Sequence, residues 1–180
     1  MSQEIIERVT HFAQGFDARV QATPADAWGN TAPCEGWTAV DVVEHVCGSA
    51  EGMAAALGGG APAEFDRNDP VACWTAASSK LLAVLPTADL NTPVERFGGM
   101  PAAMVIGRFM SMDLLVHTWD LARAVGGDEQ LDETDVAHAF EGVKGMEAML
   151  RRPGVFGPAV PAAEGDDLQT QFLKFLGRQV

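Results

Sequence analysis

Two side chains that can bind a metal ion lie within an otherwise apolar stretch, SMDLLVHTWDLARAVG, at residues 111–126. Asp113 and His117 are four residues apart, a spacing that places both on one face of a helix. At about 100° per residue, both also fall on the apolar stripe that includes Ile106 and Leu121 and should face the core. A buried carboxylate is costly unless it is paired or bound to a metal. The pair therefore predicts either a shared ligand, such as a metal ion, or an internal hydrogen bond.

A third polar residue helps to decide between these interpretations, because a catalytic zinc ion usually has three protein ligands. His45 lies at the edge of an apolar stripe in the segment GWTAVDVVEHV, which should belong to another helix. With Asp113 and His117 it completes a set of two imidazoles and one carboxylate, and helix bundles build metal sites from facing helices. Taken alone, His45 is typical of a core or boundary residue. A metal-free bundle with a simple Asp113–His117 hydrogen bond is the alternative.

Other possible ligands fit a metal site less well. Cys47 is two residues from His45, so the two side chains point to different sides of the helix, and the thiol is expected to fill space in the core. His11 and His138 lie in amphipathic segments without ligand spacing and are expected at the surface or its boundary. The sequence contains no HExxH motif, which disfavours a zincin-type protease.

The sequence assigns no catalytic residue. Asp120 and Glu44 are the nearest candidates for proton transfer, but neither has a distinguishing pattern. Asp120 lies three residues before Arg123, and we expect each to pair with the other or with a loop, which is a structural role.

Composition disfavours several classes of partner. The chain has 180 residues, which suits one domain, and its formal net charge is −13. Nucleic acids and anionic membranes both require a basic surface, so neither is expected as a partner. We expect no membrane span, because no apolar run reaches roughly 18 residues, and no signal peptide. Three cysteines without a CxxC motif favour a reducing compartment, so we expect a cytoplasmic protein.

The elements that must position these residues are helices, because Gly- and Pro-rich breaks divide segments of helical periodicity and no strand alternation occurs. This pattern predicts an all-α fold. The predicted main helices cover residues 3–21, 38–57, 71–85, 102–125 and 133–150. Thr38 and Asp41 have the spacing of a capping box. We expect residues 1–150 to form a metal-binding bundle, and residues 151–180 an irregular tail with a short helix that packs on the bundle within the same domain.

The segment of residues 111–126 also has an apolar face opposite the metal pair, formed by Met112, Leu115 and Trp119. A helix that is apolar on two opposite faces must be buried by neighbouring segments on both of them. We expect the tail to bury it within the chain, and a homodimer contact is the alternative.

Separated motifs of this sequence resemble one known family. PCEGWTAVDVVEHV and DLLVHTWDLARAVG resemble the DinB-like metal-binding superfamily, and more closely its actinobacterial group related to the metal-binding domain of mycothiol-dependent maleylpyruvate isomerase. The tail motifs PGVFGPAVP and FLKFLGR resemble the same group. The resemblance implies an up-down-down-up four-helix bundle in which His45, Asp113 and His117 bind the metal. The related isomerase has glutamate at the position of Asp113 and a further C-terminal domain, so its own activity is not carried over to this chain.

Two imidazoles and one carboxylate leave a coordination position open. Zinc suits these ligands best, and nickel, iron and manganese also fit. The first hypothesis is a metal-dependent thiol S-transferase, isomerase or hydrolase, in which the ion activates mycothiol or another low-molecular-weight thiol, or water, against a small-molecule electrophile. The alternative is a metal-containing scaffold or small-ligand-binding protein without turnover. Whether the protein is an enzyme, and on which substrate, is left open by the sequence.

Overall fold

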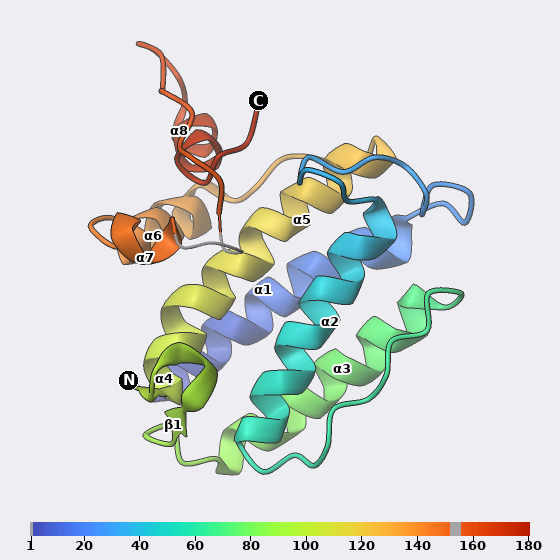
Figure 1. The fold of residues 1–180 in the computed structure, drawn as a ribbon, viewed down its shortest axis with the longest axis vertical. Coiled ribbons are helices and arrows are strands. Elements are labelled where there is room, and N and C mark those ends of the chain that lie inside the picture. The colour runs from blue at the N-terminus through green and yellow to red at the C-terminus, as the bar shows by residue number, and fades with distance from the viewer. Residues whose placement is uncertain (1, 152–155) are drawn as a thin grey trace.

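Four long helices of this computed structural model, which describes residues 2–151 and 156–180, form a bundle (Figure 1). They are α1 (Ser2–Ala22), α2 (Ala39–Ala56), α3 (Pro70–Val84) and α5 (Ser111–Val125). α1 and α2 each pack against both α3 and α5, so α1 and α2 are diagonal to each other. α1 and α5 run in one direction and α2 and α3 in the opposite one (Figure 1), which is the up-down-down-up order. The predicted all-α, DinB-like bundle is confirmed.

Shorter elements connect and flank the bundle. They are η1 (Leu85–Thr87), β1 (Pro93–Val94), η2 (Glu95–Phe97), β2 (Met100–Pro101), α4 (Ala102–Met104), η3 (Val105–Met110), α6 (Glu133–Val143), α7 (Glu147–Leu150) and α8 (Leu168–Phe175). β1 and β2 pair in antiparallel fashion. The sequence did not predict this hairpin, because strands of two residues are too short to show alternation.

The start of α2 agrees with the prediction. The carboxylate of Asp41 accepts a hydrogen bond from the backbone N–H of Thr38 at 2.7 Å, as in a capping box. Val42 and Val46 are buried on the inner stripe of this helix. His45 is adjacent to that stripe and half-buried, so the amphipathic pattern of α2 places its imidazole at the boundary of the core.

Two predicted helices are interrupted. The helix expected over residues 102–125 is helical throughout, but η3 within it is a π-helix, in which hydrogen bonds close five residues back. The helix expected over residues 133–150 divides into α6 and α7, because Gly145 adopts a φ of +82° between them. Side-chain periodicity does not distinguish these local departures from a continuous helix.

The C-terminal tail is joined to the bundle through apolar contacts and through one arginine. α8 packs against α6, and its Phe172 and Leu173 are fully buried, as is Leu176. Arg178 reaches back to α5 and is itself 7% exposed. Residues 152–155 of the predicted tail lie outside the described part of the chain. The assignment of bundle and tail to one domain stays a prediction.

Met112, Leu115 and Trp119 are buried within the chain, as expected for the second apolar face of α5. A homodimer stays an untested prediction. Within residues 2–151 and 156–180, no helix combines the length and apolar character needed to cross a membrane.

Candidate metal centre

The three predicted ligands come together between α2 and α5. His45 projects from α2, and Asp113 and His117 project from the first two turns of α5. The Nε2 atom of His45 lies 3.3 Å from Oδ2 and 3.4 Å from Oδ1 of Asp113. The Nε2 atom of His117 lies 3.4 Å from the same Oδ1. One potential ligand atom from each residue lies within 4.8 Å of the other two.

These distances fit a shared ion better than a direct hydrogen bond. A hydrogen bond between a charged imidazole and a carboxylate is about 2.7–2.9 Å long, shorter than either Asp113 contact. Two atoms that each lie about 2.1 Å from a tetrahedral zinc ion are about 3.4 Å apart. The spacing around Asp113 therefore matches the edges of a tetrahedral coordination sphere, and the nitrogen and oxygen donors are those that zinc accepts.

The second ring nitrogen of His117 is held by a carboxylate. Its Nδ1 lies 2.9 Å from Oδ2 of Asp120, which is fully buried. When Nδ1–H donates to a carboxylate, the lone pair of Nε2 is left for a metal, and the ring orientation is fixed. Asp120 is held in turn by Arg178, which donates from Nη2 to Oδ2 at 2.6 Å and from Nε to Oδ1 at 3.1 Å. A chain of hydrogen bonds thus runs from the tail through Asp120 to the site.

A second set of possible ligands, Cys34, His117 and Asp120, is also clustered. Its cation position is already filled, because Nη2 of Arg178 lies 3.2 Å from the sulfur of Cys34 and 2.6 Å from Asp120. The described partners of Asp113, by contrast, are the two imidazoles and the hydroxyl of Ser49 at 3.5 Å. The set with Asp113 is therefore the better metal site.

The electrostatics of the site favour a bound cation. Burial alone would lower the pKa of His117, but Asp113 and Asp120 outweigh burial and raise this pKa well above its usual value. Burial alone would raise the pKa of Asp113, but His117 and His45 outweigh it and hold this pKa below its usual value. The carboxylates thus stabilise positive charge beside them, either a proton on His117 or a metal ion, and metal binding requires the neutral imidazole.

One side of the site is open. The side chains of His45 and Asp113 are 32% and 20% exposed, whereas that of His117 is 4% exposed. Trp37, which precedes α2, stacks on His117 with 5.9 Å between ring centroids and lies 5.2 Å from the ring of His45. Trp37 therefore forms an aromatic wall beside both imidazoles.

The remaining histidines and Cys47 do not join the site. His11 pairs with Asp135 at 2.8 Å, and His138 bonds to Arg8 at 2.7 Å, both at the exposed boundary between α1 and α6. Cys47 is buried, and burial raises the pKa of its thiol to about 12. These placements agree with the predictions for all three residues.

Asp120 and Arg123 do not pair with each other, and the expected alternative of a loop partner is confirmed for Arg123. Asp120 binds His117 and Arg178, whereas Arg123 pairs with Glu129 in the following loop at 2.6 Å. The contact between His117 and Asp120 could have been predicted from their spacing of three residues, because residues three apart are neighbours on a helix. Arg178, 58 residues from Asp120, carried no local signal. Glu44, the other proton-transfer candidate, pairs with Arg67.

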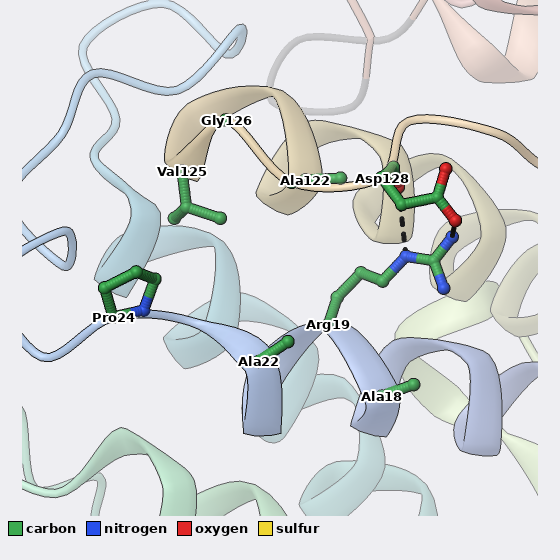
Figure 2. A pocket seen from close by; sticks show the side chains of 9 residues that line it. Ala18, Arg19, Ala22, Pro24, Ala122, Val125, Gly126 and Asp128 are labelled. Atoms are coloured by element: carbon green, nitrogen blue, oxygen red, sulfur yellow. Dashed lines mark hydrogen bonds and ion pairs between the residues drawn. The ribbon is translucent and has the colours of Figure 1, made fainter.

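A hollow of about 240 Å³ lies at the other end of α5, away from these ligands (Figure 2). Alanine side chains of α1 and α5 line it, and Arg19 extends along it to Asp128, where Nη2 and Oδ2 are 3.1 Å apart. Its cation is already paired, and none of the three candidate ligands lines it. It is therefore not part of the metal centre.

Comparison with known proteins adds family information to this geometry. The family model described as the mycothiol maleylpyruvate isomerase N-terminal domain matches residues 9–122, a range that includes all three candidate ligands. Two proteins of Mycobacterium tuberculosis are each 30% identical over 169 residues, covering 92% of this chain and 92% of theirs. Their names are "Uncharacterized protein MT0763" (strain CDC 1551 / Oshkosh) and "Uncharacterized protein Rv0738" (strain ATCC 25618 / H37Rv). No solved structure matches the chain significantly.

Proposed function

Because this chain belongs to the family of the mycothiol maleylpyruvate isomerase N-terminal domain, we propose that it binds a divalent metal ion through His45, Asp113 and His117. We further propose that it uses the ion to activate mycothiol, a similar low-molecular-weight thiol, or water against a small-molecule electrophile. The family suggests a mycothiol-related domain of metal-binding type, and candidate ligand clusters are present. The spacing of 3.3–3.4 Å around Asp113 is the observation that carries the proposal.

Each residue has a distinct part in this proposal. The two imidazoles and the carboxylate hold the ion, for which zinc is the best fit, and Asp120 orients the ring of His117. These three side chains would hold a divalent ion, which would lower the pKa of a bound thiol or water so that its proton passes to solvent and a nucleophile is available near neutral pH. The exposed sides of His45 and Asp113 give a small molecule access, and Trp37 offers it an apolar surface.

A non-catalytic metal scaffold is the alternative function, and one observation favours it. The two residues considered for proton transfer are both engaged in ion pairs, Glu44 with Arg67 and Asp120 with Arg178. Each of these carboxylates already has a guanidinium partner. Thiol activation needs no separate base where the ion itself lowers the thiol pKa, so the open side of the site favours the enzyme.

Metal content tests the site directly. The protein is purified without added metal and analysed by mass spectrometry, together with His45→Ala, His117→Ala and His11→Ala, the last being an exposed control. We expect about one ion per chain in the wild type and in His11→Ala, and loss of the ion in the other two variants. A wild type that binds no ion when metal is supplied would refute the proposal, as would retention of the ion in His117→Ala.

Turnover separates the enzyme from the scaffold. The metal-loaded protein is mixed with mycothiol and a panel of small electrophiles, and thiol consumption is compared between the wild type and His117→Ala. Metal-dependent consumption that disappears in the variant supports thiol activation. Stoichiometric metal without thiol turnover, but with hydrolysis of ester or amide substrates, favours water as the nucleophile. If neither thiol turnover nor hydrolysis is detected across the panel, the result favours the scaffold.

A further inference from the structure

The π-helix η3 ends immediately before the helix that carries two of the three ligands. The chain is helical across the junction, with φ and ψ of −62° and −45° at Ser111. The N–H of Ser111 nevertheless donates to the carbonyl of Ile106, five residues back, as well as to that of Arg108. An α-turn would instead bond this N–H to the carbonyl of Gly107, four residues back. The π-turn thus holds one residue more than an α-turn, a difference of roughly 100° in rotation between the two flanks.

The side chain of Ser111 reinforces the π-turn. Its Oγ–H donates to the same carbonyl of Ile106 at 2.9 Å, and the residue is 1% exposed. The backbone N–H and the hydroxyl of Ser111 therefore both donate to the carbonyl of Ile106. In an α-turn, the N–H four residues after Ile106 would donate to this carbonyl instead. In an α-turn a serine hydroxyl would bond the carbonyl four residues back, so the bond to the carbonyl of Ile106 exists in the π form and stabilises that form of the turn.

Asp113 depends on this turn more than the other ligands do. It lies two residues after Ser111, in the first turn of α5. His117 is anchored by a 2.9 Å bond to Asp120, whereas the contacts of the Asp113 carboxylate with the imidazoles and with Ser49 are all 3.3–3.5 Å long. Among residues 2–151 and 156–180 no short bond holds this carboxylate, so the position of Asp113 follows from the backbone at the start of α5.

We propose that Ser111 is a positioning residue for the metal centre. By closing the π-turn it sets the place of the Asp113 carboxylate relative to the two imidazoles, and so the affinity of the site for a divalent ion. The inference rests on the proposed metal binding, and its test separates the two.

Thr118 provides a matched control on the same helix. Its Oγ1 donates to the carbonyl of Leu114 at 2.7 Å, and the residue is 4% exposed, but this turn is an ordinary α-turn. Ser111→Ala and Thr118→Val each remove one buried hydroxyl-to-carbonyl bond. Zn²⁺ affinity is measured by competition with a chromophoric chelator, the visible spectrum is recorded with Co²⁺, and unfolding of the metal-free chain is followed in urea.

We expect both variants to unfold at lower urea concentration than the wild type, but only Ser111→Ala to bind Zn²⁺ about tenfold more weakly and to shift the Co²⁺ absorption. Ser111→Thr, which keeps the hydroxyl, should restore both readings. If Ser111→Ala does not fold, Ser111→Cys carries the same comparison with a weaker donor. Wild-type affinity and spectrum in the Ser111 variant, or an equal loss in Thr118→Val, would overturn the inference alone. A wild type that binds neither ion would overturn the proposed function and this inference with it.

Discussion

His117 uses both ring nitrogens, which makes it the best-defined ligand of the candidate centre. Nδ1 bonds to Asp120 at 2.9 Å, and Nε2 lies 3.4 Å from Asp113. With a side-chain exposure of 4%, the ring has little freedom to turn. The affinity of the site should therefore depend on the buried partner of His117 as well as on the ligands themselves.

Asp120→Asn tests this dependence. The amide carries no charge and can donate as well as accept, so it no longer selects the tautomer of His117 that leaves Nε2 free. We expect Zn²⁺ affinity, measured by chelator competition, to fall ten- to a hundredfold. Because Arg178 loses its buried counter-ion, the free energy of unfolding should also fall by about 3 kcal/mol. Asp135→Asn, which removes an exposed histidine partner, should change neither; an Asp120 variant with wild-type affinity would contradict the assignment.

Asp113→Glu tests whether the short carboxylate is matched to the imidazoles. The extra methylene moves the oxygens away from positions that already have the 3.3–3.4 Å spacing of tetrahedral ligands. Zn²⁺ should still bind, roughly tenfold more weakly in titration calorimetry, whereas Asp113→Ala should abolish binding. Tighter binding by the glutamate variant would show that the aspartate is not in its optimal place.

At the scale of elements, the centre depends on how two helices begin. α2 starts at a capping box formed by Thr38 and Asp41, one turn before His45. α5 starts after the π-turn that Ser111 closes, within one turn of Asp113. The positions of His45 and Asp113 therefore depend on local backbone hydrogen bonds at the starts of their helices. Substitutions can change these bonds and leave all three ligands in place.

Asp41→Asn should weaken the start of α2 in a pH-dependent manner. The hydrogen bond from Thr38, together with Arg67, holds the pKa of Asp41 below its usual value. A carboxylate with a lower pKa in the folded state stabilises fully above its unfolded pKa, and this contribution is lost as pH falls through the folded pKa. Urea unfolding should show the variant about 1 kcal/mol less stable at pH 7, with the difference shrinking below about pH 4. Glu7→Gln, at an exposed position of α1, is the control, and an Asp41 difference that is equal at both pH values would contradict the prediction.

At the scale of the whole molecule, one arginine links the C-terminal tail to the bundle. Arg178 bonds to Asp120 of α5 and to the sulfur of Cys34 in the loop before α2. Through Asp120 it reaches His117, so tail docking and metal binding should stabilise each other by the same free energy.

Arg178→Met tests this coupling. In the wild type, Zn²⁺ should slow cleavage of the tail by chymotrypsin several-fold, because metal binding stabilises the docked state that resists the protease. The variant should bind Zn²⁺ more weakly and lose most of this protection. Lys174→Met, which breaks only the ion pair with Asp166 inside the tail, should keep it. Equal protection in wild type and Arg178→Met would show that the tail and the site are independent.

The sequence by itself determined the features that depend on neighbours along the chain. Helical periodicity placed Asp113 and His117 on one face, the Thr38–Asp41 spacing located the start of α2, and Gly- and Pro-rich breaks separated the helices of an all-α fold. His45 was predicted as a ligand from its residue type and from the resemblance to a family, because no local sequence pattern connects α2 with α5. These interpretations hold because side-chain direction in a helix follows from residue spacing.

Only the tertiary structure decided the features that depend on distant residues or on small changes of hydrogen bonding. The partnership of Asp120 with Arg178 joins positions 58 residues apart, so its charge could equally have been paired with nearby Arg123. The π-turn before Ser111 is closed by a bond to the carbonyl five residues back, whereas the spacing of helical residues in the sequence predicts a bond four residues back. The 3.3–3.4 Å spacing between His45 and Asp113 arises from the packing of α2 against α5, and packing is decided by the whole core.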